Sequence, residues 1–245
     1  MVTAKRFYKE VSVSETEAGF SVALDGRALR TPKGTPLVVA SRPLAEAIAG
    51  EWAAQEATIR PHTMPLFRLA ATAVDRIGGE RRTIVDGIVA YAQTDLLCYR
   101  AEAPGDLVER QQAVWEPLLE WMVRTHGVVF SVTAGVIPVP QPAEVEPRLR
   151  RVFEACDDFE LAAMSSVTAA CGSVVLALAL AGGHIGAEEA FAAAQLDETY
   201  QAEQWGTDEE ALARREKLRK EIIAAHRFLA LAGERSEALS PVKVN

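Results

Sequence analysis

The 245-residue sequence is poor in cysteine and has no excess of basic residues. The three cysteines are Cys98, Cys156 and Cys171. Because they are odd in number and far apart, a disulfide framework and a structural zinc site are both disfavoured. This pattern is typical of a protein in a reducing compartment. The formal net charge is −8 at pH 7, and glutamates surround the one basic cluster, at residues 148–151. Because phosphate contacts need a basic face, this balance argues against nucleic-acid binding.

Targeting signals are also missing. No apolar stretch follows Lys5 and Arg6, so no secretory signal is expected, and no Arg- and Ser-rich lead-in predicts an organelle presequence. We therefore expect a cytoplasmic protein. Residues 161–183 carry no charge and could span a bilayer by length. Serine, threonine and glycine dilute this run and its near flank is acidic, so we interpret it as the central helix of a soluble bundle. The alternative hypothesis is a membrane-associated protein that uses residues 161–183. Recovery of the protein from the soluble fraction without detergent would rule it out.

Familiar catalytic motifs are absent as well. There is no glycine-rich phosphate loop and no Gly-x-Ser-x-Gly elbow. No two histidines have the i, i+4 spacing of paired metal ligands: His62, His126, His184 and His226. Adjacent carboxylates such as Asp157 and Asp158 are explained by the dipole of a helix start. We predict no metal, no cofactor and no enzymatic activity. The alternative is a soluble enzyme with a carboxylate-based site in an interdomain cleft, because unfamiliar sites carry no signature.

The N-terminal residues carry strand patterns. Residues 20–25 alternate apolar and polar side chains, which is the period of a half-buried strand. Asp25-Gly26 marks a two-residue hairpin turn. Further strands are expected at residues 7–13 and 37–39, giving a small antiparallel meander. A helix follows Ser41, with an apolar face that includes Leu44, Ile48 and Trp52.

The remaining chain has mostly helical periodicity. Prolines 138, 140 and 142 form a stiff connector, and helices are expected after it at residues 146–155, 158–181, 187–204 and 208–232. Two extended segments, residues 94–101 and 127–132, are candidates to join the N-terminal sheet. The sequence predicts an α+β fold: a small antiparallel β-rich N-terminal domain, residues 1–60, followed by a larger all-helical C-terminal domain, residues 61–245.

The four tryptophans lie near glutamine and glutamate: Trp52, Trp115, Trp121 and Trp205. The simplest interpretation of each tryptophan is that it packs in the hydrophobic core. Faces that mix Trp, Gln and Glu also suit a protein-binding groove.

An ordered set of short motifs resembles a known family. The motifs are, in order, Arg6-Phe7-Tyr8-Lys9, Leu24-Asp25-Gly26-Arg27, Thr31-Pro32, the run from Leu44 to Gln55, Met64-Pro65, Thr94-Asp95-Leu96-Leu97-Cys98-Tyr99, the run from Trp115 to Trp121, and Tyr200-Gln201 with Trp205-Gly206. Together they are similar to the ATP synthase assembly chaperones that bind the alpha subunit of the catalytic sector, the ATP-twelve family. Glu116 stands where the family often has aspartate, and the missing presequence indicates a bacterial member.

The resemblance implies a chaperone that holds newly made alpha subunit until the beta subunit docks, without hydrolysing ATP itself and as a monomer when free. An alpha subunit alone exposes the surface meant for its neighbour, which is an aggregation hazard. The resemblance also implies that Glu198 and Trp52 matter for function. The predicted partner-binding residues are Glu198, Gln201, Trp205, Glu51, Trp52 and Gln55. For Trp52, the alternative is an anchor that joins the two domains.

Overall fold

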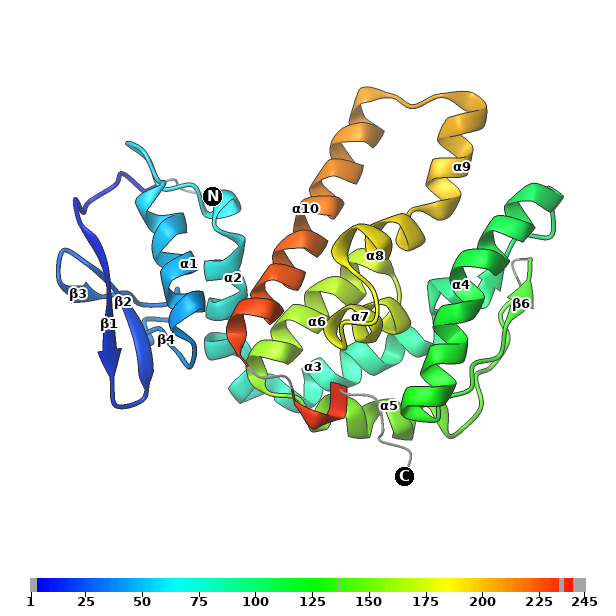
Figure 1. Cartoon of the computed structure of the whole chain (residues 1–245), viewed down its shortest axis with the longest axis horizontal. Helices are drawn as coiled ribbons and strands as arrows, with labels where there is room; N and C mark the ends of the chain where they lie inside the picture. The colour runs from blue at the N-terminus through cyan, green and yellow to red at the C-terminus, as the bar shows by residue number, and fades with distance from the viewer. Residues whose placement is uncertain (1–3, 136, 234–235, 240–245) are drawn as a thin grey trace.

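A computed structural model describes residues 4–135, 137–233 and 236–239 (Figure 1). A small antiparallel sheet lies at one end of the long axis, and helix α4 (Gly105–His126) lies at the other. The helices between them form the body of the molecule. The α+β fold class, with a small β-rich N-terminal region and a helical remainder, is confirmed.

The sheet is built around β2 (Gly19–Leu24). Strand β1 (Val11–Thr16) pairs antiparallel with β2, placing Val11 opposite Leu24. Strands β3 (Arg27–Ala28) and β4 (Val38–Val39) share the other side of β2. The predicted hairpin turn is present, with φ of 47° at Asp25 and 76° at Gly26, the two positive values that a tight hairpin needs. The predicted first strand is shifted, because β1 begins at Val11.

Helix α1 (Arg42–Ala53) covers the sheet. The Ser41 hydroxyl accepts a hydrogen bond from the backbone N–H of Leu44 and so caps the helix. Its buried residues fall on one face: Leu44, Ala45, Ile48 and Trp52. A short 3₁₀ turn (Pro61–Thr63) leads into α2 (Pro65–Thr72), which packs against α1. A π-helical turn (Ala73–Ile77) then joins α2 to α3 (Gly78–Ala90).

The centre of the helical region is α6 (Asp158–Cys171), followed by α7 (Val174–Ala181). The long helix α10 (Glu209–Ala232) packs on α6, on α8 (Ala187–Ala194) and on α2. Helix α5 (Val145–Glu154) lies against α3. Every residue of α7 is buried, which explains why this part of the chain carries no charge. Across the described residues, no helix is both long and apolar enough to cross a bilayer.

Two predicted helices are broken in the structure. The single helix predicted at residues 158–181 is wrong, because Gly172 adopts a φ of 65° and ends α6, and the Ser173 hydroxyl caps α7. The helix predicted at residues 187–204 is also two elements. Gln195 leaves helical geometry between α8 and α9 (Leu196–Trp205).

The two later extended segments do not join the N-terminal sheet. Strand β5 (Tyr99–Arg100) pairs in parallel with β6 (Thr133–Ala134), which forms a separate two-stranded sheet. The strand predicted at residues 127–132 is therefore misplaced towards the N-terminus. Three further 3₁₀ turns complete the described elements: Tyr91–Thr94, Leu96–Cys98 and Glu237–Leu239.

Candidate partner-binding surfaces

Helix α9 presents three of the predicted residues on one face. Glu198, Gln201 and Trp205 are three and four positions apart, which is the spacing of neighbours on a helix surface. All three side chains are exposed, and Trp205 is 78% accessible to solvent. Tryptophan is enriched among the residues that contribute most of the binding energy at protein–protein interfaces. This face is therefore a strong candidate for contact with another protein.

The α9 face forms one wall of a groove of about 560 Å³, and the first half of α10 forms the other. Figure 1 shows these two helices side by side, joined by a loop away from the body of the molecule. Arg215 of α10 donates to the Thr199 hydroxyl at 2.7 Å, which holds the two helices together. Neither Glu198 nor Gln201 forms a side-chain hydrogen bond with a described residue. Their polar groups remain available to a partner. We call this the α9–α10 groove.

Glu51 lies in another part of the molecule. Its two carboxylate oxygens each accept a backbone N–H, from Leu66 and Phe67, at 2.9 Å. Glu51 thereby caps the N-terminus of α2, where negative charge is stabilised. Burial raises the pKa of this carboxyl, while the two N–H groups and the nearby Arg227 oppose the shift. Its contacts make Glu51 a structural residue that links α1 to α2.

Trp52 is buried, and its ring packs edge-on against Tyr8 and Phe67 with centroids 5.7 and 5.1 Å away. Tyr8 also donates its hydroxyl proton to the Trp52 carbonyl at 2.7 Å. Tyr8 precedes the sheet and Phe67 belongs to α2, so Trp52 joins the two regions. These contacts fit the alternative prediction for Trp52, which is an anchor that joins the β-rich region to the helices.

Gln55 is also buried and has three hydrogen bonds. Its amide donates to the Glu51 carbonyl and to the Thr63 hydroxyl, and its oxygen accepts from the Arg60 backbone. Gln55 thus fixes the loop that connects α1 to α2. We leave Trp52 and Gln55 out of the proposed contact surface, because neither side chain is accessible in this structure.

The structure therefore divides the six predicted residues into two groups. The α9 group lies in the α9–α10 groove, and the α1 group lies on the other side of α10, inside the packing between α1 and α2. The spacing along the chain could not reveal this separation, because Trp, Gln and Glu occur at helical spacing in both groups.

Catalytic arrangements were sought among the buried acids. Asp95 is fully buried, yet its carboxylate accepts four hydrogen bonds, from the backbone of Leu97, Val174 and Val175 and from the Ser173 hydroxyl, at 2.7 to 3.2 Å. Burial raises the pKa of Asp95 to about 6, against the effect of these donors. A carboxylate enclosed in this way is a cap for α7 and cannot reach a substrate. Among the described residues, no group of three or more His, Cys, Asp or Glu side chains could hold a metal ion.

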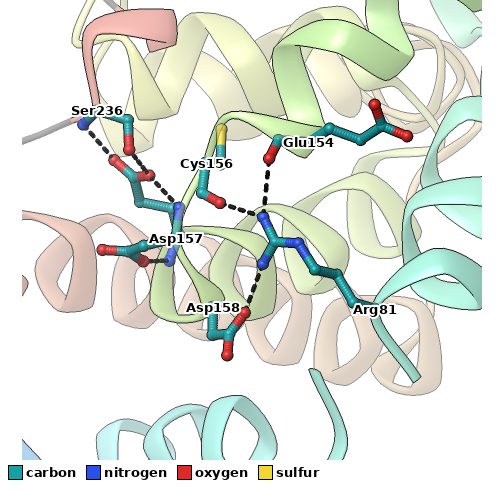
Figure 2. Close-up of polar contacts among 7 residues, drawn as sticks. Arg81, Glu154, Cys156, Asp157, Asp158 and Ser236 are labelled. Carbon is teal, nitrogen blue, oxygen red and sulfur yellow. Dashed lines mark hydrogen bonds and ion pairs between the residues drawn. The ribbon is translucent and has the colours of Figure 1, made fainter. Parts of the chain in front are cut away.

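A second polar cluster was not expected from the sequence. Figure 2 shows Arg81 of α3 directed at the turn between α5 and α6. Its guanidinium donates to the carbonyls of Glu154 and Cys156 and pairs with the Asp158 carboxylate. The cluster ties three helices together. Its signal in the sequence is weak, because Arg81 is 77 residues from Asp158.

The same cluster holds the C-terminal turn. Ser236 donates its backbone N–H, at 2.7 Å, and its hydroxyl to the buried carboxylate of Glu160 (Figure 2). Glu160 also accepts the N–H of Asp157, and Asp157 in turn accepts the N–H of Glu160, which makes a capping box at the start of α6. Leu239 lies 1% exposed at the end of this turn. Ser236 and Leu239 therefore fix this turn against the helical core.

Comparisons with known proteins agree with this geometry. A family model described as ATP12 chaperone protein matches residues 5–123. The crystal structure of Atp12 from Paracoccus denitrificans is 39% identical and superposes with a TM-score of 0.87, covering 94% of this chain and 99% of that chain. The chain belongs to the ATP12 chaperone family.

Two further relatives extend the ATP12 comparison. The mitochondrial protein atp12 of Schizosaccharomyces pombe is 29% identical over 219 residues, which are 84% of this chain and 75% of that protein. The crystal structure of the Atu1473 protein from Agrobacterium tumefaciens is 41% identical with a TM-score of 0.88, covering 94% of this chain and 87% of that one. The family predicted from the ordered motifs is confirmed, and so is the fold class.

Proposed function

We propose that this chain is an assembly chaperone of the F-type ATP synthase and holds the free alpha subunit of the catalytic sector until the beta subunit docks. Membership of the ATP12 chaperone family supports the chaperone activity. The alpha subunit as client follows from the resemblance of the ordered motifs. We expect the chain to act as a monomer in the bacterial cytoplasm, without a cofactor.

The observation that carries the proposed contact is the exposed aromatic and polar face of α9. Trp205 offers a large apolar contact, and Glu198 and Gln201 offer hydrogen-bonding groups beside it. Interfaces of this kind gain most of their free energy from a few aromatic anchors surrounded by polar groups. The enzyme alternative is not favoured, because the chain belongs to a chaperone family.

Co-expression with the cognate alpha subunit tests the proposal. We expect more soluble alpha subunit in the presence of this chain and a complex that co-purifies. Adding the beta subunit should release the chaperone from that complex. A lack of both the gain in soluble alpha subunit and the complex would refute the proposed function.

A further inference from the structure

A second groove follows α10 on the side away from α9, between α10 and the α1–α2 region. Its volume is about 780 Å³. Figure 1 places α10 between the α1–α2 pair and α9, so the two grooves lie on different faces of one helix. We call this one the α2–α10 groove.

The wall that α10 contributes is long and straight. Ala213, Lys217, Lys220, Ala224 and Arg227 line the groove, and their spacing of three or four residues keeps them on one face. The 14 residue steps from Ala213 to Arg227 correspond to about 21 Å along the helix axis. A groove of this length matches three to four turns of a helix packed along α10.

The base of the groove is apolar. Leu66 and Ala224 are buried beneath it, and Pro65 and Ile223 are half-buried and reach its surface. Together they offer a strip that the apolar face of an amphipathic helix would cover. A partner that removes this strip from water gains roughly 25 cal/mol for each Å² of apolar area.

The rim carries cations without partners. Arg68, Lys217 and Arg227 are exposed, and none of them forms an ion pair with a described residue. They come from two elements, α2 and α10, and flank the apolar strip. A positive rim is unusual on a chain with a net charge of −8.

The carboxylates of the groove offset this charge only in part. Glu51 is engaged with the backbone of α2, and Glu216 pairs with Lys220 at 3.3 Å. Glu221 is the one lining carboxylate that has no ion pair with a described residue. The backbone contacts of Glu51 do not remove its charge, and Arg68 and Arg227 lie close enough to oppose the rise in the pKa of its carboxyl. The four cations that line the groove still exceed its three carboxylates by one, and this excess favours an acidic partner.

We propose that the α2–α10 groove binds an acidic amphipathic helix of the alpha subunit. The helix lies along α10 with its apolar side on Pro65 and Ile223 and its carboxylates beside Arg68, Lys217 and Arg227. This inference rests on the proposed function and adds a second contact to the one in the α9–α10 groove. Since the rim charges are exposed, they speed association and make it sensitive to salt.

A matched pair of double variants tests the charges. Lys217→Glu with Arg227→Glu reverses two rim cations, and Arg82→Glu with Arg151→Glu reverses two exposed cations outside the groove. Both double variants lower the net charge by the same four units. We expect the groove variant to bind the alpha subunit roughly tenfold more weakly and with less salt dependence, while the control binds like the unchanged chain. Circular dichroism and melting temperature establish that both variants are folded.

A crosslinking experiment identifies the occupant. Ala213→Cys places a thiol in the groove, and the three native cysteines are buried, so a benzophenone label reacts at the new position. We expect the label to crosslink to a carboxylate-bearing amphipathic helix of the alpha subunit. Crosslinks only to a second copy of this chain, or only to a segment without carboxylates, would overturn the assignment.

The outcomes separate the two proposals. Equal binding by the unchanged chain, the groove variant and the control overturns the groove assignment and leaves the proposed function standing. Failure of the unchanged chain to hold the alpha subunit overturns the proposed function, and the groove assignment with it.

Discussion

At the scale of single residues, Glu198 is the position with the sharpest expected effect on function. Glu198→Lys reverses the charge inside the α9–α10 groove without removing an internal hydrogen bond. We expect the variant to fold normally and to lose its hold on the alpha subunit. The measurement is co-purification of the alpha subunit alongside a thermal melt.

Glu203→Lys is the control for this change. Glu203 lies on the same helix and is exposed, but it pairs with Arg110 and does not line the groove. Loss of an exposed pair costs at most about 1 kcal/mol. Equal loss of alpha-subunit binding in both variants, or full binding by Glu198→Lys, would contradict the assignment of Glu198.

Asp95 is the residue whose replacement should cost the most stability. In Asp95→Asn one oxygen becomes an NH₂ group, so in either orientation of the amide at least one buried backbone N–H loses its acceptor, that of Leu97 or those of Val174 and Val175. We expect the free energy of unfolding to fall by roughly 2–4 kcal/mol, because buried donors without acceptors are expensive. Urea denaturation measures this. The exposed Asp86→Asn, which loses only a surface pair with Arg150, should change stability by less than about 1 kcal/mol.

His126 should make stability depend on pH. Its ring packs edge-on against Trp121, its Nε2 is buried and has no partner among the described residues, and burial lowers the pKa of the imidazole. His184, stacked on the same tryptophan, has a pKa lowered by burial and by Arg124. The unfolded chain therefore binds these protons more readily, so stability is present above the ordinary histidine pKa of about 6.5 and declines as pH falls through it.

The comparison is His126→Phe, which keeps a ring against Trp121 and cannot titrate. We expect the decline in the free energy of unfolding between pH 7 and pH 5 to be shallower in this variant than in the unchanged chain. Identical slopes for the two proteins would show that His126 does not contribute.

At the scale of elements, the boundary between α6 and α7 depends on one backbone conformation. Gly172 has a φ of 65°, and a Cβ placed there would meet nothing within 4 Å. Gly172→Ala should therefore cost about 1–2 kcal/mol from the left-handed conformation alone. Gly172→Asn should cost less, because asparagine tolerates that conformation. Chemical denaturation distinguishes the two, and equal costs would mean that packing and not backbone strain determines the effect.

The boundary between α6 and α7 also shows why some elements were predicted correctly from the sequence and others were not. The hairpin at Asp25-Gly26 and helix α1 were predicted because a local signal, a turn pair or a cap, marks each, and α10 was predicted from its helical periodicity. The break at Gly172 was missed because the run around it is apolar on every side and has no periodicity to interrupt. The placement of β5 against β6 depends on contacts between segments over thirty residues apart, which no local pattern contains.

The candidate site was also predicted only in part. Glu198 and Gln201 lie within the helix predicted at residues 187–204, and the observed helix extends one residue further, to Trp205. Burial of Trp52 and Gln55 depends on the sheet and on α2, which pack over α1 from elsewhere in the chain. The α2–α10 groove was not predicted, because its cations come from helices that are distant in sequence.

At the scale of the whole molecule, the described apolar core is continuous from Tyr8 to Leu239. Trp52 and Phe67 bridge the sheet region and the helices. We expect the chain to unfold in a single transition, since neither region retains its covered surface without the other. Hydrogen exchange should give similar free energies of opening for the central amides of β2 and α7. Two separate transitions would instead show that the predicted division near residue 60 marks independent folding units.

The contact of Ser236 and Leu239 with the core has a consequence for biosynthesis. These residues are the last described part of the chain to leave the ribosome, yet they complete the surroundings of Glu160 on α6. Until residues 236–239 have left the ribosome, the carboxylate of Glu160 lacks two of its donors and the site of Leu239 is open. The core around α6 is therefore completed only after all the other described residues have been synthesised.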